Sequence, residues 1–429
     1  MSTTVTPSDS HEIQLPEVVV VDRKAPVIFG VLTVGLALII FFAAQDGDTS
    51  FRLAVPSDFV QLPTITVPST PTAWLLTAIC AVCTVLSTVW YTQKKKTPLW
   101  LVIVFAIAWM AAFLTWAAAG GTVPVVGLLA GSLALAVPLV FGAMGGVLGE
   151  RSGVVNIAID GQLLFGAFGA AMVGSLTGSP WAGLVAAMFA GLLVALVLGV
   201  FAINYRVDQV IVGVVLNVLV IGLTSFMFSQ VLAPNSASLN DPPRFERIPI
   251  PVLGDIPLIG PIFFRQTIIV YLLYVTVALV TWALWRTKWG LRVRAVGEHP
   301  KAADTVGIKV NRTRYRTILL AGAIAGMGGA FYTLVSVPQF NREMTGGAGY
   351  IALAAVIFGQ WDPIKATLAA LLFGFASNLQ GVLSVIGSPV PSQFMLMLPY
   401  VVTIFAVAGL VGRSRAPAAV GIPYRVDGH

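Results

Sequence analysis

Charged residues are scarce in this chain, and their scarcity limits its fold before any motif is considered. Of its 429 residues only 10% are charged and 57% are hydrophobic, and the mean hydropathy is +0.90. A soluble domain would carry roughly a quarter charged residues, and no polar stretch is long enough to form a separate ATPase or kinase domain. A bilayer crossing needs about 20 apolar residues. The composition therefore predicts an all-α polytopic membrane protein.

Motifs that carry catalysis are also missing. No Gly-Lys dipeptide occurs, so there is no phosphate-binding Gly-x-x-x-x-Gly-Lys-[Ser/Thr] loop. No HExxH sequence occurs either, and the three histidines, at positions 11, 299 and 429, lie outside the apolar segments. We expect no catalytic residue, no metal site and no cofactor bound by this chain. Cys80 and Cys83 could form a redox pair, but in an apolar helix ordinary packing is the expectation.

The basic residues are concentrated in one loop. Residues 286–316 hold nine Lys or Arg against Glu298 and Asp304, a net charge of +7 that equals the charge of the whole chain. The positive-inside rule places such a loop in the cytoplasm. The same rule places there the lysines 94–96, the Tyr205-Arg206 turn and the end marked by Arg413 and Arg415.

About twelve transmembrane segments satisfy these four constraints, with both termini in the cytoplasm and the long loop Ser229–Gln266 outside. At about 1.5 Å per residue, the tenth segment reaches only about half of a 30 Å core, so it is a short or broken helix. The expected segments are Pro26–Ala44, Thr72–Tyr91, Pro98–Ala119, Ser132–Leu148, Ile157–Leu176, Trp181–Ile203, Asp208–Phe228, Thr267–Trp285, Thr317–Val335, Gly349–Gly359, Ile364–Gln380 and Gln393–Val411.

An internal similarity suggests how the later segments are related. Met144-Gly145-Gly146 recurs as Met327-Gly328-Gly329, and the Asn156-Ile-Ala-Ile sequence recurs as Tyr350-Ile-Ala-Leu. The two copies run in opposite directions through the predicted topology, as an inverted-topology repeat requires; chance similarity between apolar helices is the alternative. If the repeat is real, the segments that follow the two Met-Gly-Gly helices face each other near the midplane, along a substrate path.

Polar residues inside the apolar segments are the candidates for that path. The Gly149–Asn156 stretch places two glycines around Glu150 and Arg151, which predicts a turn with exposed backbone beside protein or a water-filled cavity. Asp160 follows it, with Arg151 as its expected partner. An intramembrane charge usually faces a bundle interior, whereas an amide can equally form a helix–helix hydrogen bond of about 0.6 kcal/mol. The amides considered are Asn156, Gln162, Asn217, Asn378 and Gln380.

The basic loop contains a short predicted helix. Pro300 is suited to a first helical turn and Gly307 to a C-terminal stop, and Ala302, Ala303 and Val306 form one small apolar face between them. A short helix with small side chains suits a groove on another protein. Lying on lipid headgroups is the alternative.

Three of these motifs together resemble a known family. The stretches Gly149–Gly161, Ala295–Gly307 and Gly349–Gly359, in this order over roughly Gly127–Arg413, are similar to the permeases of ATP-binding cassette (ABC) importers. They look most like the nucleoside branch of the branched-chain amino acid and simple-sugar permeases. The chain then divides into a cytoplasmic tail (1–25), an extension with three crossings (26–126), the permease core (127–415) and a second cytoplasmic tail (416–429).

The resemblance implies partners. They are a second homologous permease, a cytoplasmic ABC ATPase with two nucleotide-binding domains that holds ATP and Mg²⁺, and an extracellular substrate-binding lipoprotein, in the lipid bilayer of a bacterial cell membrane and without nucleic acid. The loop helix matches the family's coupling helix, which meets the ATPase. The coupling residues implied are Gly297, Glu298, Pro300, Ala302, Ala303, Val306 and Gly307.

The resemblance also implies a nucleoside path. Amides would bind the base and apolar rings would stack on it. The residues considered for the path are Asn156, Asp160, Gln162, Phe165, Phe168, Asn217, Asn378 and Gln380. Asp160 stands where relatives more often have Glu, and residues 1–126 lie outside the resemblance, so the roles of both stay open. A pentose or other simple sugar is the alternative substrate, and an ion-driven secondary carrier, for which Asp160 is the one good ion site, is the alternative mechanism.

Overall fold

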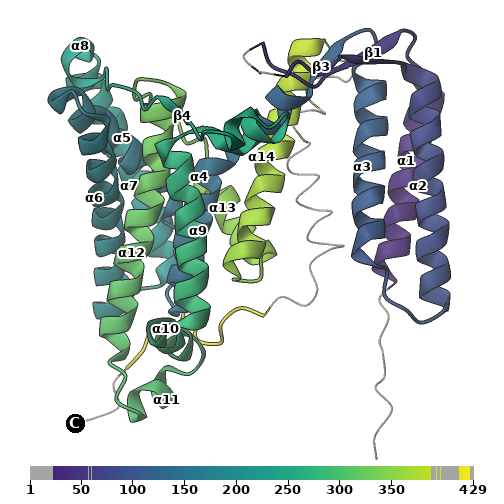
Figure 1. Ribbon diagram of the computed structural model, residues 1–429. Helices are drawn as coiled ribbons and strands as arrows, with labels where there is room; N and C mark the ends of the chain where they lie inside the picture. The colour runs from purple at the N-terminus through teal and green to yellow at the C-terminus, as the bar shows by residue number, and fades with distance from the viewer. Residues whose placement is uncertain are drawn as a thin grey trace, which may run out of the picture. The chain divides into compact units, whose positions relative to one another are not determined.

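The computed structural model describes residues 23–56, 58, 60–387, 393, 397 and 415–425. Contacts within the chain divide it into two units (Figure 1). The N-terminal unit comprises the described residues up to Gln45 together with Thr70–Trp116, and the core unit comprises Asp46–Ser69 together with the described residues from Ala117 onward. The loop between the first two helices of the expected extension 26–126 belongs to the core unit, and the division into extension and permease core stays a prediction.

The N-terminal unit is a three-helix bundle of α1 (Lys24–Phe42), α2 (Ser69–Thr92) and α3 (Leu99–Ala117). Its interior contains Phe29 stacked on Phe105, with ring centroids 3.9 Å apart. Cys80 and Cys83 are both free and buried beside this pair. The prediction that they serve packing is confirmed.

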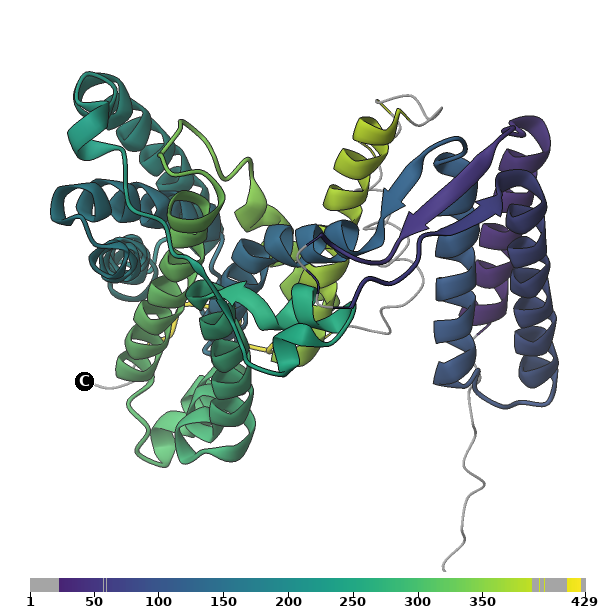
Figure 2. The same cartoon turned by 45° about the horizontal axis from the view of Figure 1, so that its top comes forward.

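The core unit contains the remaining helices, with α4 at its centre in contact with α12, α13 and α14 (Figures 1 and 2). Its helices are α4 (Val125–Arg151), α5 (Ile159–Thr177), α6 (Pro180–Gly199), α7 (Gln209–Met227), α8 (Ser236–Leu239), α9 (Ile268–Arg286), α10 (Lys288–Glu298), α11 (Pro300–Thr305), α12 (Val310–Phe331), α13 (Ala348–Phe358) and α14 (Pro363–Ile386). One turn of π-helix continues α6 (Val200–Asn204), α7 (Phe228–Leu232) and α12 (Tyr332–Ser336), and another (Gly260–Phe264) precedes α9.

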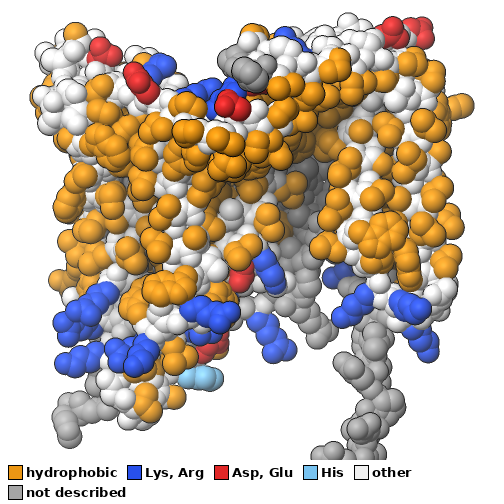
Figure 3. Space-filling view, viewed as in Figure 1, with side chains coloured by type: hydrophobic (Ala, Val, Ile, Leu, Met, Phe, Trp, Pro, Cys, Tyr) orange, Lys and Arg blue, Asp and Glu red, His pale blue; other side chains and the backbone are white. Residues whose placement is uncertain are grey.

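Ten helices of the described part are long and apolar enough to cross a membrane. Hydrophobic side chains cover the flanks of the core unit, and Lys and Arg gather toward the end that carries α10 and α11 (Figure 3). The chain is thus a multi-pass, all-α membrane protein, as predicted. The short tenth segment is also confirmed, because α13 has only 11 residues. The twelfth expected segment, Gln393–Val411, lies outside the described residues except for two helical positions, 393 and 397.

Three predicted helices have boundaries that are wrong by more than three residues. The helix expected to end at Gln380 continues to Ile386. The helix expected over Ser132–Leu148 runs from Val125 to Arg151, so Gly149, Glu150 and Arg151 are helical and the turn begins only at Ser152. The helix can continue because both charged side chains find partners at its end. The helix expected from Thr317 begins at Val310, since its basic first turns extend past the apolar segment.

Short strands lie at the end of the core unit opposite α10 and α11 (Figure 1). β1 (Asp48–Arg52) pairs with β2 (Ile65–Pro68) in antiparallel and with β3 (Thr122–Pro124) in parallel orientation. A hairpin of β4 (Arg247–Pro249) and β5 (Arg265–Thr267) lies in the expected long loop. Arg265 Nη1 contacts Asp58 Oδ1 at 2.8 Å, which ties the loop between α1 and α2 to the core.

Glycines allow the buried helices to touch backbone to backbone. Gly322 and Gly326 form a small-xxx-small pair on α12 and face Gly191 of α6, the arrangement that favours close packing of membrane helices. A Cβ at Gly326 would lie 3.0 Å from the Cα of Gly191. The Met-Gly-Gly motifs serve the same purpose: a Cβ at Gly145 of α4 would lie 2.8 Å from the carbonyl oxygen of Ala321 on α12.

Candidate functional site

The candidate site begins where α5 and α13 start. The Gly349 amide donates to Asp160 Oδ1 at 2.9 Å, and Thr345 Oγ1 lies 3.4 Å from Asp160 Oδ2. A Cβ at Gly349 would collide with the backbone of Asp160, so only glycine permits this approach. The two segments paired by the internal repeat therefore meet at these residues, and their position near the membrane midplane stays a prediction.

Two predicted amides bind each other in this region. Asn156 Nδ2 donates to Gln162 Oε1 at 3.1 Å, and Gln162 Nε2 donates to Asn156 Oδ1 at 3.0 Å. Both residues are fully buried. The pair holds the turn between α4 and α5 against the first turn of α5.

Asn217 of α7 joins the same cluster. Its Oδ1 accepts from the amide of Gly161 at 2.8 Å, and its Nδ2 donates to the carbonyl of Ile157 at 2.9 Å and to the hydroxyl of Tyr350 at 3.0 Å. In this conformation both Nδ2 hydrogens are used by the protein. The helix–helix hydrogen bond that was the alternative to a substrate contact is thus what the structure contains here.

The two candidate aromatic residues lie farther along α5. Phe165 and Phe168 are parallel, with ring centroids 6.0 Å apart, and Phe168 meets Phe340 edge to face at 5.4 Å. Phe340 is itself fully buried, and Asn240 fixes its backbone. The three rings form an apolar wall next to the polar cluster.

Asn378 and Gln380 are not brought into this cluster. Asn378 of α14 donates to the carbonyl of Leu128 at 2.7 Å and lies 3.4 Å from Ser132 Oγ, in the first half of α4. The polar cluster instead lies beyond Arg151, at the C-terminal end of α4. The assignment of Gln380, half-buried on α14, to the path stays a prediction.

The predicted pairing of Asp160 with Arg151 is wrong. Arg151 Nε donates to the carbonyl of Trp361 at 2.9 Å, and its guanidinium lies 5.4 Å from the ring of Trp285. Glu150 accepts a hydrogen bond from the indole N–H of Trp361. The last turn of α4 is therefore tied to the turn between α13 and α14, more than 200 residues away in the sequence.

The Ala295–Gly307 stretch also contacts the end of α4. A Cβ at Gly297, near the end of α10, would collide with the carbonyl oxygen of Arg151, so α10 packs directly on the end of α4. The stretches that contain Glu150, Gly297 and Gly359 thus converge at the end of the core unit that carries α10 and α11. We call this convergence the motif hub.

The short loop helix forms much as expected. α11 has six residues and begins with Pro300, and Gly307 follows it with φ +83°. Its expected apolar face is wrong in one position, because Ala303 is buried against Val296, Val310 and Tyr424 of the same chain. Ala302 and Val306 are exposed, Val306 to 74%.

Gly297 and Glu298 are likewise engaged within the chain. The carbonyl of Gly297 accepts from the amide of Ala419 at 2.9 Å, and Glu298 Oε2 accepts from the amide of Ala418 at 3.1 Å. The other expected docking residues lie on the outer side of α11. They are Pro300, Ala302, Val306 and Gly307.

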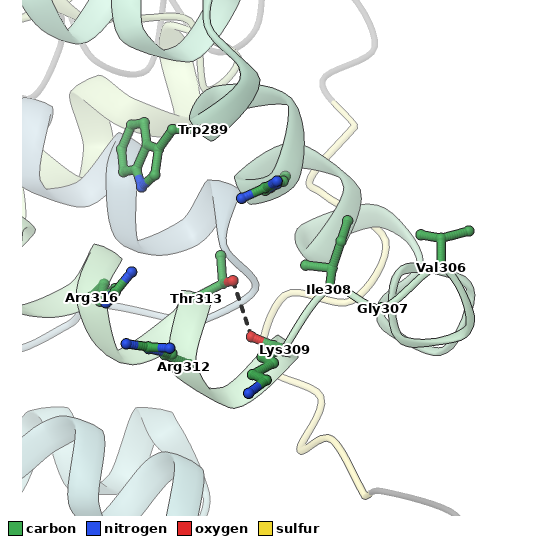
Figure 4. Close-up of a pocket in the computed structure, with 9 residues that line it drawn as sticks. Trp289, Val306, Gly307, Ile308, Lys309, Arg312, Thr313 and Arg316 are labelled. Atoms are coloured by element: carbon green, nitrogen blue, oxygen red, sulfur yellow. Dashed lines mark hydrogen bonds between the residues drawn. The ribbon is translucent and has the colours of Figure 1, made fainter.

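A basic pocket of about 310 Å³ lies beside α11 (Figure 4). Its described lining contains Trp289 and Val306 and no acidic side chain. The four basic side chains of the lining are Arg292, Lys309, Arg312 and Arg316. An apolar protrusion beside a basic pocket can receive a partner surface that carries an apolar groove with acidic groups next to it.

Several residues that contact the polar cluster or the motif hub were not predicted from the sequence. Trp361 and Tyr350 were missed because their partners come from distant segments, although Tyr350 stands inside the internal repeat. Gln209 Oε1 accepts from the amide of Val155 at 2.7 Å and supports the turn after α4. On the sequence alone, residues 415–425 fall at the end of the predicted core and in the predicted C-terminal tail, and no motif in them predicts their contacts.

Comparison with known proteins identifies relatives of the core. Residues 128–407 match the family described as branched-chain amino acid transport system / permease component. The chain is 42% identical over 306 residues to the guanosine ABC transporter permease protein NupQ of Bacillus subtilis, covering 68% of this chain and 94% of that protein. It is 38% identical over 312 residues to the nucleoside ABC transporter permease protein NupC of Lactococcus lactis, covering 69% and 96%.

A second Bacillus subtilis protein is a more distant relative. The guanosine ABC transporter permease protein NupP is 25% identical over 295 residues, covering 66% of this chain and 80% of NupP. No solved structure matches the chain. In each of these relatives the similarity covers about two thirds of this chain.

Proposed function

Because the chain belongs to the branched-chain amino acid transport system permease family, we propose that it is the permease subunit of an ABC importer for nucleosides. The observation that carries this proposal is the motif hub, in which the end of α10 directly before the loop helix, the end of α4 and the turn after α13 meet. Two relatives that are 42% and 38% identical are named for guanosine and nucleoside transport, which supports the substrate class.

The proposed assembly has a second, similar permease. NupQ and NupP come from one bacterium and are both named guanosine ABC transporter permease proteins, but they are 42% and 25% identical to this chain. This supports a pair of unlike permeases. An ATPase with two nucleotide-binding domains would supply the energy with ATP and Mg²⁺, and an extracellular lipoprotein would deliver the substrate. By the positive-inside rule, the basic end with α10 and α11 and both termini face the cytoplasm.

The ATPase would dock on α11. Val306 and Ala302 present its exposed side, and the basic pocket lies beside them. An acidic rim on the ATPase groove would complement Arg292, Lys309 and Arg312. Steering by such a rim would make docking faster at low than at high ionic strength.

Movement of α11 can reach the candidate site through α13. The end of α13 is tied to α4 through Trp361, and its start is tied to α5 through Asp160 and to α7 through the Asn217–Tyr350 hydrogen bond. A shift of the motif hub would therefore tilt α13 and strain the hydrogen bonds at its start. The Asn217 amide released in this way, together with Asn156 and Gln162 of the adjoining segment, could then bind a nucleobase, with Phe165 and Phe168 beside it.

Uptake by the reconstituted complex tests the proposal. We expect proteoliposomes that contain both permeases, the ATPase and the binding protein to accumulate labelled guanosine with ATP and not with a non-hydrolysable analogue. Ribose is the matched probe, because it is the sugar without the base. Uptake of ribose but not guanosine would contradict the nucleoside substrate and favour a simple sugar. Accumulation driven by an ion gradient without ATP would contradict the ABC mechanism and favour a secondary carrier.

A further inference from the structure

The described C-terminal residues 415–425, which we call the C-terminal strap, lie against the α10–α11 end of the core unit. Ala419 and Tyr424 are buried, with 5% and 7% exposure. The strap has no regular secondary structure beyond one turn, so its position depends on contacts with other segments. Those contacts involve three elements that are far apart in the sequence.

The first contact is with the end of α10, directly before α11. The amide of Ala419 donates to the carbonyl of Gly297 at 2.9 Å, and the amide of Ala418 donates to Glu298 Oε2 at 3.1 Å. The ring of Tyr424 packs with Val296 and with Ala303 of α11. The inner side of the proposed docking helix thus rests on the strap.

The second contact is with the turn between α4 and α5. The amide of Gly421 donates to the carbonyl of Gly153 at 3.3 Å. Gly153 has φ +88°, and a Cβ there would lie 3.2 Å from the carbonyl oxygen of Ala419. This turn leads directly to Asn156 and Asp160, so the strap touches the segment that carries the candidate site.

The third contact is with the first turns of α12. Arg314 is 1% exposed, and its Nη1 donates to the carbonyl of Ile422 at 3.0 Å. A Cβ at Gly153 would also lie 2.7 Å from Arg314 Nη2, which places the guanidinium between the strap and the turn after α4. A buried charge that loses its acceptor is strongly unfavourable, so the strap and this end of α12 are held together.

We propose that the C-terminal strap transmits the movement of α11 to the turn between α4 and α5, with Tyr424 as a positioning residue for coupling. This proposal rests on the proposed function. Displacement of α11 moves the cluster of Ala303 and Tyr424, and the hydrogen bond between Gly421 and Gly153 carries that displacement to the segment before Asp160. The strap is a second route to the candidate site, parallel to α13.

The experiment measures uptake and ATP hydrolysis together in the reconstituted full complex. In Tyr424→Ala the cluster loses its ring, and we expect uptake per ATP hydrolysed to fall about fivefold or more while the ATPase still co-purifies with the permease. Tyr424→Phe retains the ring and should restore most of the ratio. Ile422→Ala is the matched control, because that side chain is 55% exposed and the substitution keeps the carbonyl that Arg314 binds.

An unchanged ratio in Tyr424→Ala would overturn the proposal. A proportional loss of uptake, hydrolysis and co-purified ATPase would also overturn it, because the strap would then only support the fold. If Tyr424→Ala does not yield folded complex, Tyr424→Leu fills the same cluster, and failure of both to fold assigns the strap to stability alone. Failure of the proposed function is seen separately, as wild-type complex that does not take up guanosine.

Discussion

Asp160 is a buried carboxylate whose described contacts are hydrogen bonds rather than an ion pair. It accepts from Gly349 and lies within reach of Thr345, and both contacts join α5 to the start of α13. If its role is to accept these bonds, an amide can replace it, because the Asn oxygen still accepts from Gly349. If its role is to bind a coupling ion, the amide cannot replace the charge.

We therefore expect Asp160→Asn to retain guanosine uptake within a few-fold of wild type. Asp160→Ala leaves the Gly349 amide without a partner, which costs about 1–3 kcal/mol, and should lower both thermal stability in detergent and uptake. Uptake and melting temperature measured on the same preparations separate the two variants. Complete loss of uptake in a stable Asp160→Asn protein would favour the ion-driven carrier.

At the residue scale the sequence identified which side chains need partners but not which partners they have. A polar group among apolar residues must be paired, so Asn156, Gln162 and Asn217 could be selected from the sequence alone. The sequence pairs Arg151 with Asp160, the carboxylate that follows it inside the same apolar region, whereas Arg151 binds the carbonyls of Trp361 and Gln360. Nothing in local spacing reports a contact across 210 residues.

At the scale of single elements, α11 offers a contrast between its two sides. Val306 is 74% exposed and Ala303 is 4% exposed. We expect Val306→Asp to leave the melting temperature of the isolated permease unchanged but to reduce ATPase co-purification, because a charge on the apolar protrusion must be desolvated on docking. The same charge at Ala303 enters the cluster around Tyr424 and should lower the melting temperature itself.

Ala302→Asp is the control for charge on the exposed side. It should behave like Val306→Asp, although more weakly, because Ala302 has the smaller apolar surface to lose. Lower thermal stability in Val306→Asp, or normal ATPase binding in both exposed variants, would contradict the assignment of this surface to docking.

Element boundaries and faces were less predictable than element existence. Hydropathy finds membrane helices because the backbone must be satisfied internally in lipid, and every expected span within the described part overlaps a helix. The pattern of Ala302, Ala303 and Val306 could not show which residues face outward. Tyr424 packs in the same cluster as Ala303, and it comes from the predicted C-terminal tail, far along the sequence from α11.

At the scale of the whole molecule, the N-terminal unit stands apart from the family. The family match begins at residue 128. The similarity to the relative that is 42% identical includes 94% of that protein but only 68% of this chain. We therefore expect a chain that begins at Ala117 to insert and to take up guanosine with the same partners. Because β1, β2 and the contact of Asp58 with Arg265 are lost with this deletion, its melting temperature should be lower.

Asp58→Ala in the full chain is the matched control for that deletion, because it removes the same ion pair while Arg265 keeps its contact with Asp255 and all helices remain. Equal losses of thermal stability in both proteins would assign the effect to this contact. Abolished uptake by a well-folded deletion protein would instead give the N-terminal unit a part in transport.

The glycine contact between α6 and α12 restricts how this protein can open and close. Where Gly191 meets Gly322 and Gly326, a slip of one residue would press a methyl or larger group into the opposite main chain. These two helices must consequently travel as one rigid piece. Any switch of access between the two sides of the bilayer then has to be accommodated by helices outside this pair.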